Sequence, residues 1–394
     1  MSDNSRIHVA VVGLGFGAEF VPIYLDHPQV GEVWVCDPNE TQLNKIGDRF
    51  HIANRCQDLR AILENPEITA VHLVSPIPLH AQQATAVLGA GKHCACTVPM
   101  ATSISDLQAI IAAQRRTGKH YMMMETAVYT REFLYVKERY ERGDFGRIQF
   151  LRGAHYQDME NWPGYWLGLP PMHYATHAIS PLLALSGTRA ESVHCFGSGW
   201  MRPELHAQYG NPYPVETAIF RLEGMDVAAE VTRSLFHTAR AYTESFNLYG
   251  EAMTFEWQQI EEEDPVLYAM APLHPGRGRP IRVERIHVPD YAHLLPAEVA
   301  RYTRQFVYDD RETHLSFLQG GGHGGSHPHL VHEFVSSIVE GRSPWIGAVT
   351  AANWTAAGIC AHASAMKGGV EVVIPRFDEY EGSTESCQYR EGTS

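Results

Sequence analysis

The sequence lacks any apolar run approaching the roughly 20 residues that a bilayer-spanning helix needs. It also has little positive charge, since 31 Lys and Arg residues stand against 45 Asp and Glu residues, for a net charge of −14. This balance argues against nucleic acid and anionic membrane surfaces as partners. The opening residues, MSDNSRIHVAVVG, lack the charged leader, apolar stretch and cleavage site of an export signal, so we expect a cytoplasmic protein.

Cysteines are few and scattered. The seven cysteines show no spacing typical of a zinc site, so we expect reduced thiols and no bound metal. With 44% hydrophobic and 19% charged residues, the composition is that of an ordinary globular protein. A chain of 394 residues is long enough for two domains.

The first 125 residues alternate strand-like and helix-like segments. IHVAVVG (7–13) is a continuous apolar run, as in a strand buried on both faces. Further strand-like segments are 30–37, 68–76, 92–98 and 120–125, and helix-like segments lie between them at 17–27, 40–50, 57–64, 79–90 and 103–117. This order predicts an α/β fold, with a Rossmann-type doubly wound parallel sheet in a first domain over residues 1–126.

A different pattern follows residue 126. After a helix-like stretch at 130–146, longer alternating segments such as ETAIFRLEG and ESFNLYG are joined by turn residues. They predict a C-terminal α/β domain over 127–394 with an open, mostly antiparallel sheet. Residues 258–329, rich in Pro, Gly and His, are expected to form a long ordered excursion near a site, and the polar tail from 379 is expected to be loose.

A glycine-rich turn, VVGLGFGAEF, separates the first strand-like run from the first helix-like one. Gly13 permits a tight turn, Gly15 lets a pyrophosphate approach the backbone, and the helix N-terminus faces the phosphates. Asp37 lies 20 residues past Gly17, where an acid binds the ribose 2′-hydroxyl and disfavours NADP. Two simpler alternatives do not involve a cofactor: the glycines could form only a structural strand-to-helix turn, and Asp37 could form only a turn with the proline that follows it. The residues expected to contact NAD here are Gly13, Leu14, Gly15, Phe16, Gly17 and Asp37.

Two downstream motifs, VSPIPLH (74–80) and ATAVLGAGKH (84–93), resemble the glucose-fructose oxidoreductase/inositol dehydrogenase/MocA family. The resemblance covers nearly the whole chain and implies a Rossmann domain followed by an open antiparallel sheet. It also implies that the nicotinamide side of the cofactor is lined by Ser75, Pro76 and His80, followed by Thr97 and Val98.

The sequence departs from the dehydrogenases of that family. They carry Glu-Lys-Pro where this chain has Thr97-Val98-Pro99, and an Asp-x-x-x-His pair where it has His173 and His177. It is more similar to the NAD-dependent glycosidase branch, which includes α-N-acetylgalactosaminidases and sulfoquinovosidases. Val-Pro at 98–99, Tyr-x-Thr-His at 174–177 and His-Gly-Gly at 323–325 match that branch.

The branch implies a redox route to hydrolysis. NAD⁺ takes a hydride from carbon 3, a base removes the proton of carbon 2, the aglycone leaves carbon 1, water adds and the hydride returns, so no carboxylate pair is needed. Tyr174 and His177, three apart on one predicted helix and with His173 on the same face, are expected to handle the hydroxyl proton. His155 or Tyr156 is the expected base at carbon 2, and only one of these adjacent strand residues can face the site. His173 and His177 also have the spacing of a metal pair, but no third ligand is evident.

The resemblance and the aromatic segment ENWPGYW together suggest the residues that contact the sugar: Tyr129, Arg131, Tyr156, Asp158, Trp162 and His323. Some of these features have a simpler alternative. Trp162 could pack in the core, Arg131 could have a structural role, and GGGHGGS (320–326) could be a flexible linker.

The function that this pattern predicts is an NAD⁺-dependent hydrolase of a small sugar glycoside, similar to a sulfoquinovosidase or an α-N-acetylgalactosaminidase. Two alternatives stay open: an NAD-dependent sugar or cyclitol dehydrogenase that uses His177, and a cofactor-binding module without catalysis. The family's broad sheet often pairs with another subunit, so we expect a homo-oligomer, either a dimer or a tetramer.

Overall fold

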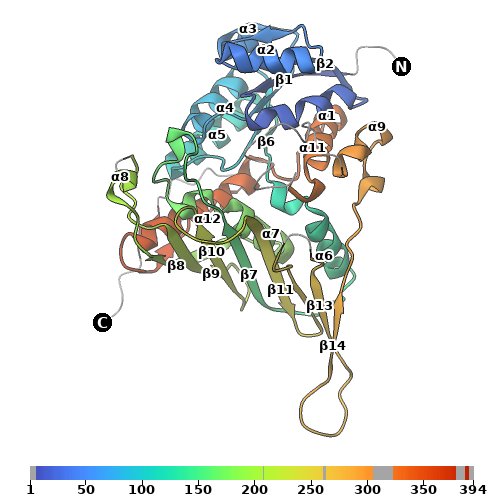
Figure 1. The fold of residues 1–394 in the computed structure, drawn as a ribbon, viewed down its shortest axis with the longest axis vertical. Coiled ribbons are helices and arrows are strands. Elements are labelled where there is room, and N and C mark those ends of the chain that lie inside the picture. Colours follow the sequence, from blue (N-terminus) through green and yellow to red (C-terminus); the bar gives the residue numbers. More distant parts are fainter. Residues whose placement is uncertain (1–5, 207, 261–262, 305–322, 379–386, 390–394) are drawn as a thin grey trace. The chain divides into compact units, whose positions relative to one another are not determined.

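The computed structural model describes residues 6–206, 208–260, 263–304, 323–378 and 387–389. The chain divides into two compact units. Unit 1 comprises residues 1–129, 290–355 and 377–384, and unit 2 comprises 130–289, 356–376 and 385–394. Figure 1 labels many of the helices and strands of both units.

Unit 1 contains a six-stranded parallel sheet in the order β3-β2-β1-β4-β5-β6. Its strands are β1 (Ile7–Val12), β2 (Val30–Cys36), β3 (Arg55–Cys56), β4 (Ala70–Leu73), β5 (His93–Cys96) and β6 (Tyr121–Met123). Strands β1, β2 and β6 are labelled in Figure 1. Val9, Ala10 and Val11 of β1 are fully buried, as expected for a strand covered on both faces. The predicted Rossmann-type sheet is confirmed, and the added two-residue β3 has no apolar run that could have revealed it.

The helices of unit 1 up to residue 129 follow the sequence pattern closely. They are η2 (Phe16–Glu19), α1 (Val21–Asp26), α2 (Glu40–Arg49), α3 (Leu59–Glu64), η3 (Ile77–Leu79), α4 (His80–Gly89), α5 (Ile104–Thr117) and η4 (Thr126–Val128). Asn39 and Ser103 cap α2 and α5, because each side chain accepts a hydrogen bond from a first-turn N–H. The helix expected over 17–27 is instead split at Phe20 into η2 and α1.

The chain returns to unit 1 after residue 289. The returning elements are η7 (Ala292–Leu294), α9 (Ala297–Ala300), η8 (Arg301–Thr303), η9 (His323–Gly325), α11 (His327–Glu340) and the first part of α12 (Ala348–Ala365). The Tyr302 hydroxyl donates to the Asp26 carboxylate over 2.7 Å, and His27 Nε2 lies 3.1 Å from His332 Nδ1. The division expected at residue 126 placed these segments in the second domain, but they belong to unit 1, where α9 and α11 pack on α1, a pairing that local sequence patterns do not encode.

Unit 2 is built on a ten-stranded sheet in the order β14-β13-β12-β11-β7-β10-β9-β8-β15-β16. The strands are β7 (Ile148–Tyr156), β8 (Ala190–Ser198), β9 (Val215–Leu222), β10 (Ala228–Ser234), β11 (Thr243–Gly250), β12 (Met253–Glu256), β13 (Val266–Met270), β14 (Ile281–Arg285), β15 (Val372–Val373) and β16 (Gln388–Tyr389). Among the described strands of this sheet, only β7 and β10 pair in parallel, so the predicted mostly antiparallel sheet is confirmed.

The helices of unit 2 are α6 (Arg131–Glu141), η5 (Gly164–Trp166), η6 (Pro171–Tyr174), α7 (Thr176–Ser186), α8 (Pro203–His206) and the remainder of α12. Among them, α7 packs on strands β7, β10 and β11. Helix α7 approaches β7 so closely that a Cβ on Gly153 would lie 2.1 Å from the Ala178 carbonyl oxygen. Only glycine fits there, because any side chain would clash with Ala178, and Gly153 therefore allows α7 to pack close to the sheet.

Three expectations change with the structure. Cys360 and Cys387 form a disulfide with Cα atoms 6.0 Å apart, so the expectation that all cysteines are reduced is wrong for this pair. The single helix expected to carry Tyr174 and His177 is broken at Ala175 between η6 and α7. The tail from residue 379 was expected to be loose, but Cys387 forms the disulfide with Cys360 and β16 pairs with β15, so that expectation is wrong for residues 387–389. The rest of the tail and the GGG of residues 320–322 lie outside the described residues. Within the described chain, no helix has the length and apolarity required to cross a bilayer.

Candidate active site

A row of polar side chains crosses four neighbouring strands at one end of the sheet of unit 2. Glu216 on β9 is paired with Arg233 on β10, Arg233 with His155 on β7, and His155 with Glu244 on β11. All four are at most 8% exposed. Each occupies the inward position of its strand, where the alternation otherwise supplies apolar residues.

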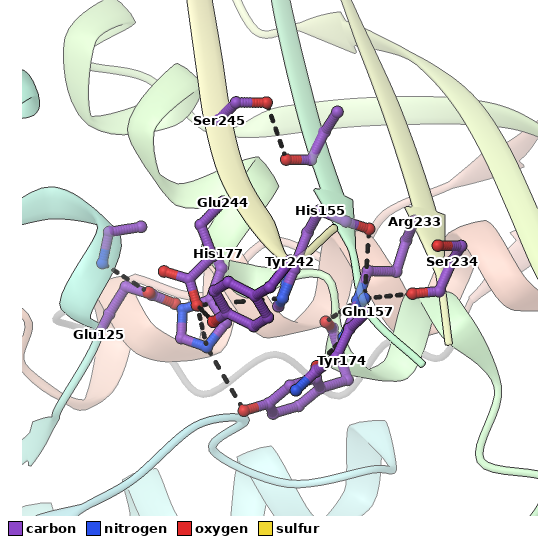
Figure 2. A network of polar contacts seen from close by, with 12 residues as sticks. Glu125, His155, Gln157, Tyr174, His177, Arg233, Ser234, Tyr242, Glu244 and Ser245 are labelled. Atoms are coloured by element: carbon purple, nitrogen blue, oxygen red, sulfur yellow. Dashed lines mark hydrogen bonds and ion pairs between the residues drawn. The ribbon is translucent and has the colours of Figure 1, made fainter. Parts of the chain in front are cut away.

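One end of this row gathers a compact cluster of acid–base groups (Figure 2). His155 Nε2 lies 3.9 Å and His177 Nε2 3.7 Å from the same Glu244 oxygen, Oε1. The Tyr242 hydroxyl donates a hydrogen bond to that oxygen, and the Tyr174 hydroxyl lies 3.4 Å from His177 Nε2. The cluster therefore links Tyr174, His177, Glu244 and Tyr242 in one line of proton-exchanging groups.

Arg233 holds the backbone around the cluster. Its Nε donates to the Tyr174 carbonyl over 2.9 Å, its Nη1 to the His155 carbonyl over 3.2 Å and its Nη2 to Gln157 Oε1 over 2.9 Å. The guanidinium carbon also lies 5.3 Å from the centre of the Tyr174 ring. One buried cation thus fixes the positions of two predicted catalytic residues from strand β10.

Burial sets the electrostatics of the site. It raises the pKa of Tyr242 well above its ordinary value, and the negative charge of Glu244 adds to that effect. It lowers the pKa of Arg233 to about 10, although nearby Tyr174, Tyr242 and Glu244 oppose the shift. At neutral pH Tyr242 therefore stays protonated as a donor and Arg233 stays charged.

His173 lies in a second polar group. Its ring packs edge-on against His362 with centroids 5.0 Å apart, and His362 Nδ1 lies 2.7 Å from Glu216 Oε1. Glu216 Oε2 accepts the Met172 N–H over 2.8 Å. His173 was expected to share a helical face with His177, but the break at Ala175 separates the two residues. The contacts of His173 anchor η6, while Tyr174 at the end of η6 reaches His177.

The remaining predicted substrate residues of unit 2 are distributed differently. Trp162 packs edge-on against Trp166, and Trp166 against Tyr174, with centroids 5.8 and 4.8 Å apart. Asp158 is exposed and caps the backbone of Glu160. Arg131 is the half-buried first residue of α6. Trp162 is thus connected to the cluster through aromatic contacts.

His155 and Tyr156 point to opposite faces of β7, as strand geometry requires. His155 faces the cluster, and Tyr156 lines a cavity of about 390 Å³ with Arg152 and Ala154 of its own strand. Arg240 lies over the Tyr156 ring, 5.8 Å from its centre. Of the two candidates for the base at carbon 2, only His155 shares a site with His177.

In unit 1, the glycine-rich turn fits the requirements of a dinucleotide. A Cβ on Gly13, whose φ is +90°, would lie 2.5 Å from the Val74 carbonyl oxygen, whereas a Cβ on Gly15 would meet nothing within 4 Å. Gly13 thus makes the tight turn, and Gly15 leaves open space beside an exposed backbone. Leu14 N–H donates to Asp37 Oδ2 over 2.7 Å, and Asn39 N–H to Oδ1 over 2.8 Å. Each carboxylate oxygen keeps a lone pair for a ribose hydroxyl.

The other predicted cofactor residues follow the neighbouring strands. Ser75 and Pro76 come after β4, and Thr97 and Val98 after β5. His80 ties these segments together, because its Nδ1 lies 2.7 Å from the Pro99 carbonyl oxygen and its Nε2 2.9 Å from that of Ser75. The strand order turns between β1 and β4, which is where open α/β sheets bind dinucleotides.

Two predicted sugar contacts belong to unit 1. Tyr129 stacks on His329 with centroids 6.4 Å apart and packs edge-on against Trp345. His323 packs edge-on against Phe16 of the glycine-rich turn, with centroids 5.6 Å apart.

The cluster in unit 2 also has the composition of a metal site. His155, His177 and Glu244 each offer one ligand atom, and these atoms lie within 4.8 Å of one another. Two histidines and one glutamate can hold zinc. The expectation of no metal rested on the absence of a third ligand for His173 and His177, whereas Glu244 offers a third ligand atom to a different pair, His155 and His177.

Three residues of the site escaped the sequence reasoning: Arg233, Tyr242 and Glu244. Arg233 and Glu244 had a recognisable signal, because each is a charged residue at a strand position where the alternation otherwise places apolar residues. Arg233 follows Ala229 and Val231, and Glu244 precedes Phe246 and Leu248. Tyr242 precedes β11 and carried no comparable signal.

Several known proteins and one protein family are similar to this chain in sequence. Residues 7–125 match the model of the oxidoreductase family with an NAD-binding Rossmann fold. A glycosyl hydrolase family 109 protein of Porphyromonas gingivalis is 23% identical over 94% of this chain and 84% of its own length. A similarly named protein of Saccharopolyspora erythraea is 23% identical over 46% of this chain, a match that spans 44% of that relative.

The structure also resembles solved dehydrogenases. Levoglucosan dehydrogenase in complex with NADH and levoglucosan matches with a TM-score of 0.74 at 21% identity, covering 94% of this chain and all of that one. At this identity the likeness concerns the fold. The family match, the parallel sheet and the glycine-rich turn agree with one another: residues 7–125 form a Rossmann-type domain that matches the oxidoreductase family with an NAD-binding Rossmann fold.

Proposed function

We propose that this protein is an NAD⁺-dependent glycoside hydrolase that cleaves a small sugar conjugate by transient oxidation. The observation that carries the proposal is the buried line of Tyr174, His177, Glu244 and Tyr242 with His155 beside it. It supplies several groups that exchange protons, as a multistep redox hydrolysis requires. The similarity to glycosyl hydrolase family 109 proteins over 94% of the chain supports the same function.

Bound NAD⁺ supplies a hydride acceptor, and later a hydride donor, at carbon 3 of the sugar. The protein supplies the proton transfers. His177, with Tyr174 at 3.4 Å, accepts the proton of the carbon 3 hydroxyl as the C–H bond breaks. Glu244 stabilises the positive charge that His177 gains, because its Oε1 lies 3.7 Å away.

The ketone at carbon 3 acidifies the neighbouring C–H bond at carbon 2. His155 is the proposed base there, since it shares Glu244 with His177 and its ring centroid lies 5.2 Å from that of His177. The electron pair of the C–H bond forms the carbon 1–carbon 2 double bond and expels the aglycone. Water then adds to carbon 1, carbon 2 regains a proton, and hydride and proton return to carbon 3 and its oxygen.

The net reaction consumes only glycoside and water, so the test separates turnover from cofactor reduction. We expect nitrophenyl glycosides to release nitrophenol without net NADH, and we expect product made in D₂O to carry deuterium at carbon 2. The panel includes α-N-acetylgalactosaminides and sulfoquinovosides. Product that keeps its original hydrogen at carbon 2 would contradict the elimination step.

An NAD-dependent sugar dehydrogenase is the second candidate. The His177–Glu244 pair favours it, because a carboxylate-supported histidine is by itself a sufficient base for oxidising a hydroxyl. Stoichiometric NADH from free sugars, with no bond cleavage in glycosides, would select this function.

A further inference from the structure

We propose that the turn His323–Gly325 and His327 retain the dinucleotide in unit 1, with His323 as a contact of its pyrophosphate portion. The resemblance to glycosidases suggested instead that His323 reaches the sugar. The inference rests on the proposed function, and it names the residues that keep the cofactor bound through one catalytic cycle.

The first argument is the contact between these residues and the glycine-rich turn. His323 and His327 both pack edge-on against Phe16, with centroids 5.6 and 5.5 Å apart, and His327 also lies 4.6 Å from the Phe20 ring. Phe16 directly follows Gly15, whose backbone is exposed beside open space. His323 therefore stands at the turn that binds pyrophosphate in a Rossmann sheet.

The second argument is the backbone of the turn. His323, Gly324 and Gly325 all have left-handed φ angles, of 47°, 59° and 81°. A Cβ on Gly325 would lie 2.6 Å from the Thr303 carbonyl oxygen, so the turn is pressed against η8. A histidine in this conformation is uncommon, and such conformations cluster at binding sites because the surrounding structure must enforce them.

The third argument is charge. Glu19 lies two residues past Gly17 and its Oε2 is 3.4 Å from His327 Nδ1. Burial raises the pKa of Glu19 to about 8, so at neutral pH this carboxyl is largely uncharged. An ionised carboxylate so near the turn would repel a pyrophosphate, and the buried, His327-paired state removes that repulsion.

Retention has a chemical purpose in the proposed cycle. The hydride taken from carbon 3 must return to the same sugar, so the reduced cofactor has to stay bound until water has added. A dehydrogenase has the opposite need, because it must release NADH after every turnover. Contacts that slow cofactor release therefore suit a redox-neutral hydrolase.

The test measures release of the cofactor without any sugar. The full-length protein is loaded with NADH and mixed with excess NAD⁺, and the loss of bound NADH fluorescence gives the dissociation rate. His323→Asn removes the ring and keeps a residue that tolerates positive φ, and we expect release about 3- to 10-fold faster. His51→Asn is the matched control, since His51 has a φ of 54° and lies in unit 1 after α2.

A second pair of variants guards against a misfolded His323 variant. Gly325→Ala forces the turn away from Thr303, whereas Gly118→Ala imposes a similar φ strain in open space. We expect faster NADH release only from Gly325→Ala. Unchanged release in both His323→Asn and Gly325→Ala, or a raised KM for the sugar with normal NADH release, would overturn the inference. Failure of the hydrolase proposal would appear separately, as no glycoside cleavage by a protein that still holds NADH.

Discussion

Glu244 is the residue whose charge most directly supports the proposed chemistry, and Glu244→Gln is the sharpest test of it. The substitution keeps the shape of the side chain and an oxygen that accepts from Tyr242, but removes the negative charge. At 3.7 Å from His177 Nε2, that charge stabilises an imidazolium by at most about 4.5 kcal/mol at an effective dielectric constant near 20. We therefore expect kcat to fall about 10²- to 10³-fold.

The assay is steady-state cleavage of the best nitrophenyl glycoside, with NADH affinity and thermal unfolding measured on the same samples. Glu230→Gln is the matched control, because Glu230 pairs with Arg152 on the opposite face of the sheet, where both side chains are partly exposed. We expect the control to keep near-normal kcat. If Glu244→Gln also keeps kcat within about threefold while binding NADH normally, the proposed role of the carboxylate is refuted.

Three further predictions follow from the site and the cofactor turn. Tyr174→Phe should lower kcat about 10²-fold with little change in thermal unfolding, as a lost proton-transfer group does; unaltered turnover would remove this hydroxyl from the mechanism. Asp37→Ala should reduce the preference for NADH over NADPH, measured as the ratio of dissociation constants, and a constant ratio would show that Asp37 does not contact the ribose. Because burial raises the pKa of Glu19 to about 8 from 4.5, the folded state holds an extra proton between these values. Its stabilising contribution is full below pH 4.5 and is lost as pH rises through 8, by up to about 1.4 kcal/mol per pH unit. Urea unfolding at pH 5, 6.5 and 8 should therefore show a smaller decline for Glu19→Gln than for the natural sequence; equal slopes would contradict the assignment.

The sequence predicted unit 1 better than unit 2 because unit 1 is assembled from local signals. The apolar run of β1, the capping residues Asn39 and Ser103 and the glycine-rich turn each act over a few residues. The strands and helices of the Rossmann sheet therefore fell within a few residues of their expected positions.

The candidate site depends on register across strands, which no local pattern reveals. His155 and Glu244 are 89 residues apart in sequence yet directly paired across β7 and β11. The sequence singled out Tyr174, His177 and His155, and the structure brings these side chains together, but the helix proposed to join the first two does not exist as one element. Their approach depends instead on Arg233, which holds the Tyr174 and His155 carbonyls, and on Gly153, which lets α7 approach the sheet.

The late return of residues 290–355 to the first unit has a consequence for how the protein is made. A chain emerging from the ribosome exposes β1 to β6 long before α11 exists to pack on α1. Unit 1 cannot complete its packing until α11, which ends at Glu340, has been translated. A gene fragment ending near codon 129 should therefore yield insoluble or protease-sensitive polypeptide, even though it carries the whole nucleotide-binding sheet.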